Sequence, residues 1–276
     1  PKLQGYRGCS NASYRTCAIL MSARIIDGKE IAAQMRQELK QEASELTAKG
    51  MTPGLGVILV GDDPASRSYV TAKERACDKA GLYSDDNRLP AETTQEELLV
   101  LIRKMNDDPK IHGILVQLPL PGHIGESATL ITIDPDKDVD SFHPWTVGNM
   151  VIGEHTFLPC TPHGIVQILE RNNVETSGAH VVVVGRSNLV GIPIANMMLQ
   201  KKKSANATVT ICHTGTKDLA SHTRQADILI VAAGRTNTVT ADMVKDGVVV
   251  IDVGVNRVED ERRKLGFRLV GDVDFE

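Results

Sequence analysis

Residues 181–193 read Val-Val-Val-Val-Gly-Arg-Ser-Asn-Leu-Val-Gly-Ile-Pro, and this run constrains the fold more than any other. Four consecutive valines predict a strand that is buried on both faces of a parallel sheet. The valines are followed by a turn at Gly185 and Ser187 and by a helix that begins near Gly191. This order offers backbone N–H groups to a phosphate, which predicts a nucleotide-binding α/β domain. The spacing Gly-x-Ser-x-x-x-Gly-x-Pro also differs from the common Gly-x-Gly-x-x-Gly, so it is specific to few families.

The rest of the chain alternates strands and helices in the same way. We expect helices at 28–49, 66–80, 93–106, 165–172 and 191–200, and strands at 54–60, 83–89, 112–117, 181–184, 207–212, 227–231, 248–253 and 268–271. Two of these helices have start signals, a capping-box spacing at Thr93–Glu96 and a cap followed by a first-turn proline at Thr161–Pro162. This alternation predicts a mostly parallel sheet.

The length of 276 residues suits two domains. We expect two α/β domains with a cleft between them, the second a Rossmann-like doubly wound parallel sheet. An acidic, turn-rich loop at 134–140 leads into the boundary, which gives domains at 22–142 and 143–276. Residues 1–21 are interpreted as a disordered or artefactual extension, because residues 1–20 carry no acid and no initiating Met and because Met21 resembles a true start. The alternative for these residues is a mitochondrial transit peptide.

Composition excludes several classes of function. The formal net charge is −4 and no basic stripe occurs, so we expect no nucleic-acid partner. No apolar run approaches the roughly 18 residues of a membrane span. The five cysteines include no Cys-x-x-Cys pair, and the chain has no close Cys/His cluster. We therefore expect a reducing compartment, the cytoplasm, and no metal site.

The second nucleotide-domain strand indicates which cofactor binds. NAD preference often appears as an acid at the end of this strand, where it holds the ribose 2′-hydroxyl. Here the strand ends in His213, Thr214 and Gly215, and Arg186 in the preceding turn could bind a 2′-phosphate through two hydrogen bonds. NADP is therefore favoured over NAD, although Arg186 could be a solvated turn residue. Small residues at 232–234 and 252–255 would leave room for a ribose and a nicotinamide.

Four polar residues in the first half are candidates for chemistry. Tyr69 and Lys73 lie one helical turn apart on one face. This pair is similar to the Tyr-x-x-x-Lys of short-chain dehydrogenases, but there it follows the nucleotide loop, whereas here it precedes it. Taken alone, the pair is more often a coincidence of the surface. Gln117 closes an apolar strand and Asp140 closes Lys-Asp-Val-Asp, and for these a loop cap and a solvated acidic turn are the simpler alternatives.

Residues 22–276 resemble the bifunctional methylenetetrahydrofolate dehydrogenase/methenyltetrahydrofolate cyclohydrolases, especially their bacterial members. The resemblance rests on motifs in the family's order: Ile26-Asp-Gly-Lys29, Ser68-Tyr-Val with Lys73, Val116-Gln-Leu-Pro-Leu-Pro121, Asp136-Lys-Asp-Val-Asp140, Pro159-Cys-Thr-Pro162, Val184-Gly-Arg-Ser with Val190-Gly191 and Pro193, Val250-Ile-Asp-Val-Gly254, and Val270-Gly-Asp-Val273. So many motifs in one order make chance similarity very improbable.

This resemblance implies NADP-dependent oxidation of 5,10-methylenetetrahydrofolate, hydrolysis of the methenyl product to 10-formyltetrahydrofolate, and a homodimer. It implies that Lys73 is the catalytic lysine, Tyr69 its stacking and orienting partner, Gln117 a hydrogen-bonding partner, and Asp140 the anchor of the pterin. The residues that it implies for substrate binding are Tyr69, Lys73, Val116, Gln117, Leu118 and Asp140. Those that it implies for cofactor binding are Thr161, Gly185, Arg186, Ser187, Leu189, Thr214, Ala233, Gly234 and Val255.

The chain departs from the family pattern at two places. Ser141 stands where the family usually has glycine after the pterin aspartate, and if that position needs a positive φ the serine is strained and could misplace Asp140. The family also continues into a Pro-Gly-Gly-Val-Gly loop and a further helix, so we expect the chain to be a C-terminally truncated fragment. The alternatives are a folate- or nucleotide-binding pseudoenzyme and an unrelated NAD(P)-dependent oxidoreductase that shares only the cofactor fold.

Overall fold

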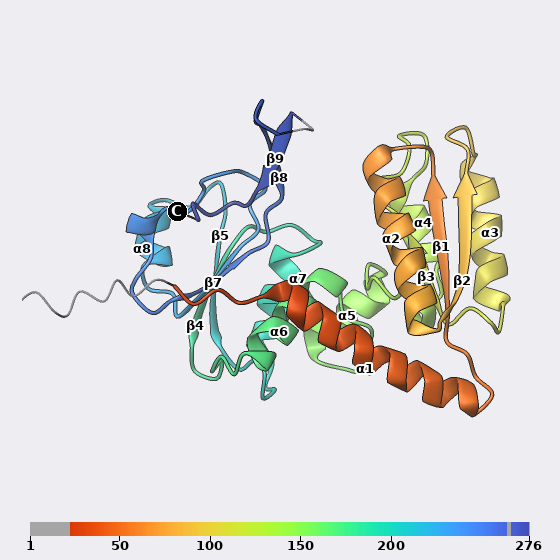
Figure 1. The fold of residues 1–276 in the computed structure, drawn as a ribbon, viewed down its shortest axis with the longest axis horizontal. Helices are drawn as coiled ribbons and strands as arrows, with labels where there is room; N and C mark the ends of the chain where they lie inside the picture. Colours follow the sequence, from red (N-terminus) through yellow and green to blue (C-terminus); the bar gives the residue numbers. More distant parts are fainter. Residues whose placement is uncertain (1–22, 264–265, 276) are drawn as a thin grey trace, which may run out of the picture.

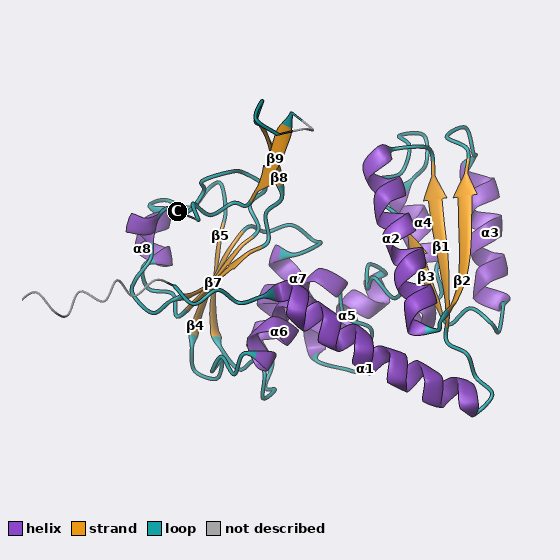
Figure 2. Ribbon diagram, viewed as in Figure 1, coloured by secondary structure: helices purple, strands orange, loops and turns teal. Residues whose placement is uncertain are grey.

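The computed structural model describes residues 23–263 and 266–275, so the expected extension at 1–21 lies outside the described residues. Two separate parallel sheets with helices on their faces form two α/β units (Figures 1 and 2), as the sequence predicts. The helix α1 (Gly28–Ala48) runs beside both units. It packs on α2 (Pro64–Ala80) of the first unit and on α6 (Cys160–Arg171) of the second. In the described part of the chain, no helix is both long and apolar enough to cross a membrane.

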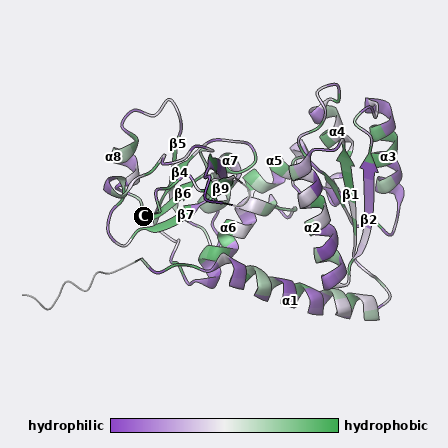
Figure 3. Ribbon diagram, turned by 45° about the horizontal axis from the view of Figure 1, so that its top comes forward, coloured by the Kyte–Doolittle hydropathy of each residue, from purple (hydrophilic) through white to green (hydrophobic). Residues whose placement is uncertain are grey.

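The first sheet has the strand order β2-β1-β3, from β1 (Gly54–Val60), β2 (Tyr83–Leu89) and β3 (Gly113–Val116). Alternate residues of the central strand β1 face opposite sides, so Val57 and Leu59 pack on α2 (Pro64–Ala80). Ile58 packs on α3 (Gln95–Asp107). The helix α4 (Glu126–Thr132) packs beside α3. Hydropathy differs between the two neighbouring strands, since β1 is hydrophobic and the edge strand β2 is polar (Figure 3).

The second sheet is parallel throughout, with the order β5-β4-β6-β7. Its strands are β4 (His180–Val184), β5 (Thr208–Cys212), β6 (Ile228–Val231) and β7 (Val249–Asp252). One face, with Val181 and Val183, packs against α5 (Pro144–Ile152), α6 (Cys160–Arg171) and α7 (Gly191–Leu199). The other, with Val182 and Val184, packs near α8 (Leu219–Thr223) and the short 3-10 helix η2 (Ala241–Met243). Both faces of the valine strand are therefore buried, as predicted.

The structure corrects several details of the expected elements. The capping box is formed by Thr94 and Glu97, one residue later than expected, because the Thr94 hydroxyl accepts the Glu97 N–H and the Glu97 carboxylate accepts the Thr94 N–H. Thr161 does not cap its helix, because α6 already begins at Cys160. The helices α4, α5 and α8 were not predicted, nor was β8 (Asn256–Glu259), which pairs antiparallel with β9 (Phe267–Val270) outside both parallel sheets.

Candidate active site

The helix α2 presents the two predicted catalytic residues on one face. Asp63 accepts the backbone N–H of Ser66 to start this helix, and Gly81 ends it in the left-handed conformation that favours glycine. Lys73 Nζ donates a hydrogen bond of 3.1 Å to Gln117 Oε1. Gln117 is itself oriented, since its Nε2 donates to the carbonyl of Leu118 at 2.7 Å. The structure thus brings together a lysine and an amide oxygen that lie 44 positions apart in the chain.

Tyr69 lies one turn before Lys73 and is 60% exposed, which leaves its ring accessible for stacking. Val116 differs from the other residues predicted to bind the substrate, because its side chain is buried in the core of the first unit. Any contact of Val116 with a substrate would therefore use its backbone. The bond between Leu118 and Pro119 is cis, directly after Gln117.

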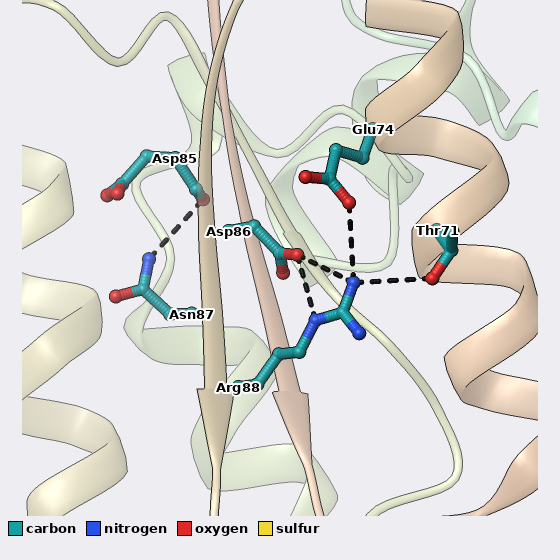
Figure 4. Close-up of polar contacts among 6 residues, drawn as sticks. All are labelled: Thr71, Glu74, Asp85, Asp86, Asn87 and Arg88. Carbon is teal, nitrogen blue, oxygen red and sulfur yellow. Dashed lines mark hydrogen bonds and ion pairs between the residues drawn. The ribbon is translucent and has the colours of Figure 1, made fainter.

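Polar side chains on β2 attach this edge strand to α2 (Figure 4). Arg88 donates to the Asp86 carboxylate at 2.9 Å, to the Thr71 hydroxyl at 3.3 Å and to the Glu74 carboxylate at 3.4 Å. Thr71 and Glu74 lie close to Lys73 in the sequence, so this cluster holds the part of α2 that carries Lys73. The same contacts explain why a strand as polar as β2 can pair with β1.

The Asp140 carboxylate lies between the two units. The Cys160 thiol, at the first residue of α6, is 3.7 Å from Asp140 Oδ1 and 3.6 Å from the Val139 carbonyl oxygen, and it donates to both. Burial raises the pKa of Asp140, while the positive charge of Lys73 and the thiol hydrogen bond act against that rise. Burial and the nearby Asp140 charge also raise the pKa of Cys160 to about 11, so the thiol keeps its proton at neutral pH.

Ser141 adopts a φ of 57°, so the position does require the left-handed region, as anticipated from the usual glycine. The residue is 1% exposed, and its hydroxyl has no hydrogen-bond partner among the described residues. Its backbone N–H donates to the Asp138 carbonyl at 3.2 Å, which closes the turn that carries Asp140. The turn therefore forms in spite of the serine.

The predicted cofactor residues gather at the carboxyl edge of the second sheet, where parallel-sheet ligand sites form. Gly185 follows β4 with a φ of 126°, and a Cβ there would collide with the Ala232 carbonyl. A Cβ on Gly191 would collide with the backbone of Gly185. The Ser187 hydroxyl accepts the N–H groups of Val190 at 3.2 Å and Gly191 at 3.5 Å, so it occupies amides that a phosphate could otherwise bind. These close contacts explain the unusual spacing of the motif.

The residues predicted to select NADP lie beside this turn. Arg186 is exposed, and no carboxylate of the described residues forms an ion pair with it. Thr214 is exposed after β5, where His213 Nδ1 accepts the Gly215 N–H at 3.0 Å. A neutral ring that accepts at Nδ1 carries its proton on Nε2, which can then donate to an anion. The site thus offers a guanidinium, a hydroxyl and an imidazole N–H.

The remaining predicted cofactor residues are accessible but more scattered. Leu189 is 49% exposed and Val255 is 67% exposed. Thr161 is exposed in the first turn of α6. Ala233 and Gly234 follow β6, but their N–H groups donate to the buried carboxylate of Asp272.

Sequence reasoning assigned no role to two residues of this region, Cys160 and Asp272. Both lie inside motifs that carry the family resemblance, Pro-Cys-Thr-Pro and Val-Gly-Asp-Val. The signal available in the sequence for Asp272 was an aspartate between a glycine and a valine, inside a family motif that follows a predicted strand. Nothing in the sequence indicated that Cys160 would reach the Asp140 loop.

Comparisons with known proteins cover both units. The sequence model of the tetrahydrofolate dehydrogenase/cyclohydrolase catalytic domain matches residues 26–140, and that of the NAD(P)-binding domain matches residues 159–276. The bifunctional protein FolD of Syntrophus aciditrophicus is 60% identical over 93% of this chain and 87% of its own. The FolD of Bacillus subtilis is 54% identical over 93% of this chain and 87% of its own.

Solved structures agree with these matches. The FolD methylenetetrahydrofolate dehydrogenase/cyclohydrolase of Campylobacter jejuni superposes with a TM-score of 0.86 at 47% identity, covering 92% of this chain and 87% of that one. The Trypanosoma brucei enzyme, solved with NADP and an inhibitor, gives a TM-score of 0.84 at 38% identity, covering 92% and 86%.

An unrelated oxidoreductase that shares only the cofactor fold would match in the second unit alone. The first unit, which carries Lys73 and Asp140, matches as well, so that alternative is wrong. The chain belongs to the tetrahydrofolate dehydrogenase/cyclohydrolase family.

Proposed function

We propose that Lys73, Tyr69, Gln117 and Asp140 form one site in which this chain carries out both reactions of its family. These are the NADP-dependent oxidation of 5,10-methylenetetrahydrofolate to the methenyl form and the hydrolysis of that product to 10-formyltetrahydrofolate. The observation that carries the proposal is the 3.1 Å hydrogen bond from Lys73 to an oriented Gln117, with Asp140 close enough for its charge to interact with Lys73.

Asp140 anchors the folate in this proposal. The aminopyrimidine edge of a pterin presents two N–H donors side by side, which match the two oxygens of a carboxylate. Asp140 must be ionised to accept both bonds. Lys73 and the Cys160 thiol favour the ionised form against the effect of burial, so both support substrate binding through Asp140.

The residues at the carboxyl edge of the second sheet fit NADP. Gly185 and Gly191 let the turn pack closely on its own helix and on the loop after β6, since a Cβ at either position would collide with backbone there. Arg186 would bind the 2′-phosphate through its guanidinium, with Thr214 beside it. NADP supplies the acceptor for the hydride that leaves the one-carbon bridge.

The oxidation needs no strong base from the protein, because the lone pair of the substrate nitrogen drives hydride departure. The task of this chain is to hold the folate so that the bridge faces the cofactor. Tyr69, exposed one turn before Lys73, would stack against the folate and fix its orientation.

The hydrolysis needs proton transfer. Water attacks the cationic methenyl carbon and gives up its two protons in turn. One folate nitrogen gains a proton as the ring opens and the formyl C=O forms, so that one proton is released overall. Lys73, whose charge supports Asp140, would first donate its proton to the leaving nitrogen and then, as the free amine, accept the second proton of the added water, while Gln117 Oε1 keeps the amine in place. One amine can thus serve both steps.

Three further properties belong to this proposal. The domains are 22–142 and 143–276, which agrees with where the two family matches fall. The chain forms a homodimer and acts in the cytoplasm, as its resemblance to bacterial family members implies. Light scattering of the purified protein would test the dimer, and a mass equal to one chain would contradict it.

The deciding experiment compares Lys73→Ala with Lys79→Ala, a matched change at an exposed lysine on the same helix outside the site. We expect Lys73→Ala to abolish loss of the methenyl absorbance and Lys79→Ala to leave both activities near those of the original chain. Normal cyclohydrolase activity in Lys73→Ala would refute the role of Lys73. Binding of folate and NADP without turnover in the unaltered chain would indicate a pseudoenzyme instead.

A further inference from the structure

Asp272, two residues after the end of β9, is a completely buried carboxylate with four donors around it. Its Oδ2 accepts the N–H groups of Ala233 at 2.6 Å and Gly234 at 2.8 Å. Its Oδ1 accepts the N–H of Arg235 at 2.9 Å and the side-chain amide of Asn256 at 2.8 Å. Three successive backbone amides of the loop after β6 therefore converge on one side chain.

Three successive N–H groups that point to one spot form a concave site for an anion. In this chain the anion is the carboxylate of Asp272, so these amides are not available to a cofactor phosphate. Ala233 and Gly234 are nevertheless exposed on their other side. Asp272 therefore holds the loop through the N–H groups on its buried side, while the opposite side of the loop is exposed to solvent.

This loop lies against the Gly185 turn, since a Cβ on Gly185 would collide with the Ala232 carbonyl. The position of the loop thus limits the position of the proposed cofactor turn. A shift of the loop would change both the space beside Gly185 and the surface offered by Ala233 and Gly234.

Both the backbone and the carboxylate of Asp272 are held by their neighbours. Asp252, at the end of β7, accepts the Asp272 N–H at 2.9 Å and the Val273 N–H at 3.1 Å. The position of Gly254 has no room for a Cβ, which would collide with the Asp272 carboxylate. Asp272 also accepts the Thr238 N–H on its backbone carbonyl at 2.7 Å, which closes the far end of the same loop.

We infer that Asp272 is a positioning residue that preorganises the loop of residues 233–235 for NADP, and that it serves the dehydrogenase reaction and not the cyclohydrolase reaction. The inference rests on the proposed function, because it takes this loop as part of the cofactor site. Its physical basis is that a loop ordered before binding loses less conformational entropy when the ligand arrives. The cyclohydrolase reaction needs no cofactor, so it provides an internal control.

The test is Asp272→Asn, with Asn256→Ala as its matched control. Asparagine replaces one acceptor oxygen by an N–H donor, so it cannot accept all three loop amides. Asn256→Ala removes one bond to Asp272 and leaves the three loop bonds intact. We expect Asp272→Asn to weaken NADP binding, measured by titration calorimetry, by about tenfold, with cyclohydrolase kcat and KM near those of the original chain. Asn256→Ala should keep normal NADP affinity.

Other outcomes of these titrations are also decisive. Equal losses of both activities that follow the fall in Tm would show a merely structural role and overturn the inference, as would unchanged NADP affinity in Asp272→Asn. Failure of the unaltered chain to bind NADP would refute the proposed cofactor site instead.

Hydrogen exchange on the unaltered chain gives a second measurement that does not depend on the folding of a variant. The amides of residues 233–235 are expected to exchange slowly without NADP and to change little when it is added, because Asp272 already holds them. Fast exchange that slows only with NADP would show that the cofactor orders the loop, and this would overturn the inference.

Discussion

Replacement of Ser141 by glycine should stabilise this protein. The residue combines two unfavourable features, a φ of 57° and a buried hydroxyl with no hydrogen-bond partner among the described residues. The whole residue is only 1% exposed, so its Cβ and hydroxyl are buried. The Ser141 N–H bond to the Asp138 carbonyl does not depend on the side chain, so the turn should persist in the glycine variant.

The size of the effect follows from four contributions. Glycine removes the strain of an L-residue in the left-handed region, about 1–2 kcal/mol. It removes the cost of an unpaired buried hydroxyl, about 1–3 kcal/mol. Against these gains stand the greater freedom of glycine in the unfolded chain, about 0.4–1 kcal/mol, and the loss of one buried methylene, about 0.8 kcal/mol. The net expectation is a free energy of unfolding that is higher by about 1–2 kcal/mol.

Thermal unfolding with Ser141→Ala as a comparison separates the two features. Alanine removes the hydroxyl and keeps the strain, so its Tm should lie above that of the serine protein. Relief of strain in glycine is offset by the freedom of glycine in the unfolded chain and by the lost methylene, so the glycine and alanine proteins should have similar Tm values. For Ser141→Gly we expect a rise of roughly 3–6 °C, because about 1 kcal/mol shifts Tm by about 2–4 °C in chains of this size. Glycine that is less stable than alanine by about 1–2 kcal/mol, the sum of its two costs without any relief of strain, would refute the strain argument. Alanine that is no more stable than serine would show that the hydroxyl has a favourable partner.

Two further predictions concern the ligands. Arg186→Ala should weaken NADP by at least about tenfold and NAD much less, measured as KM for each cofactor, and equal losses would disprove a 2′-phosphate contact. Because the pKa of Asp140 is raised, KM for the methenyl substrate should stay constant at high pH and increase as the pH falls through that pKa, above the range of an ordinary aspartate. Cys160→Ala should move this increase to still higher pH, since it removes a donor that stabilises the charge, whereas Cys160→Ser should not. A KM profile that is identical in both variants would contradict the role of the thiol.

Regular elements were predictable where local signals agree with packing. The strand at 54–60 has the expected bounds, and the helix before Gly81 has the expected end, because buried aliphatic runs and a left-handed glycine act within a few residues. This helix begins at Pro64, two residues before the predicted start. The capping box was misplaced because Thr93 and Thr94 each have a glutamate three residues later. Only tertiary packing, which buries Thr93, distinguishes the two registers.

The missed elements have weaker local signals. The strand β8 reads Asn-Arg-Val-Glu, with a single aliphatic residue, and it forms because β9 pairs with it. Arg257 also stacks over the Phe267 ring at 3.9 Å, a contact between the two strands that no short-range pattern reveals. The helix α5 begins at Pro144 and ends at Gly153, but its apolar sequence has no clear polar face.

The site was predictable as a set of residues, but not as a connected structure. Lys73 and Asp140 could be named from family motifs, whereas the contact of Asp140 with Cys160 joins residues 20 positions apart in different units. A second link between the units is the paired hydrogen bonding of Arg171 on α6 with Glu38 on α1, at 2.6 and 2.9 Å. Such contacts depend on how finished elements pack, which local sequence does not encode.

The contacts of these residues define two groups, one on the folate side and one on the cofactor side, that affect the two reactions differently. In the proposed function, the folate side depends on Lys73, Gln117 and Asp140, and both reactions use it. The loop held by Asp272 affects the cofactor side, which only the oxidation uses. Cys160 lies in the second unit but donates to Asp140, which belongs to the folate side. A shift of one unit relative to the other would therefore alter the folate side, which both reactions use. Changes between the units should therefore reduce both activities together, whereas changes confined to the Asp272 network should reduce one.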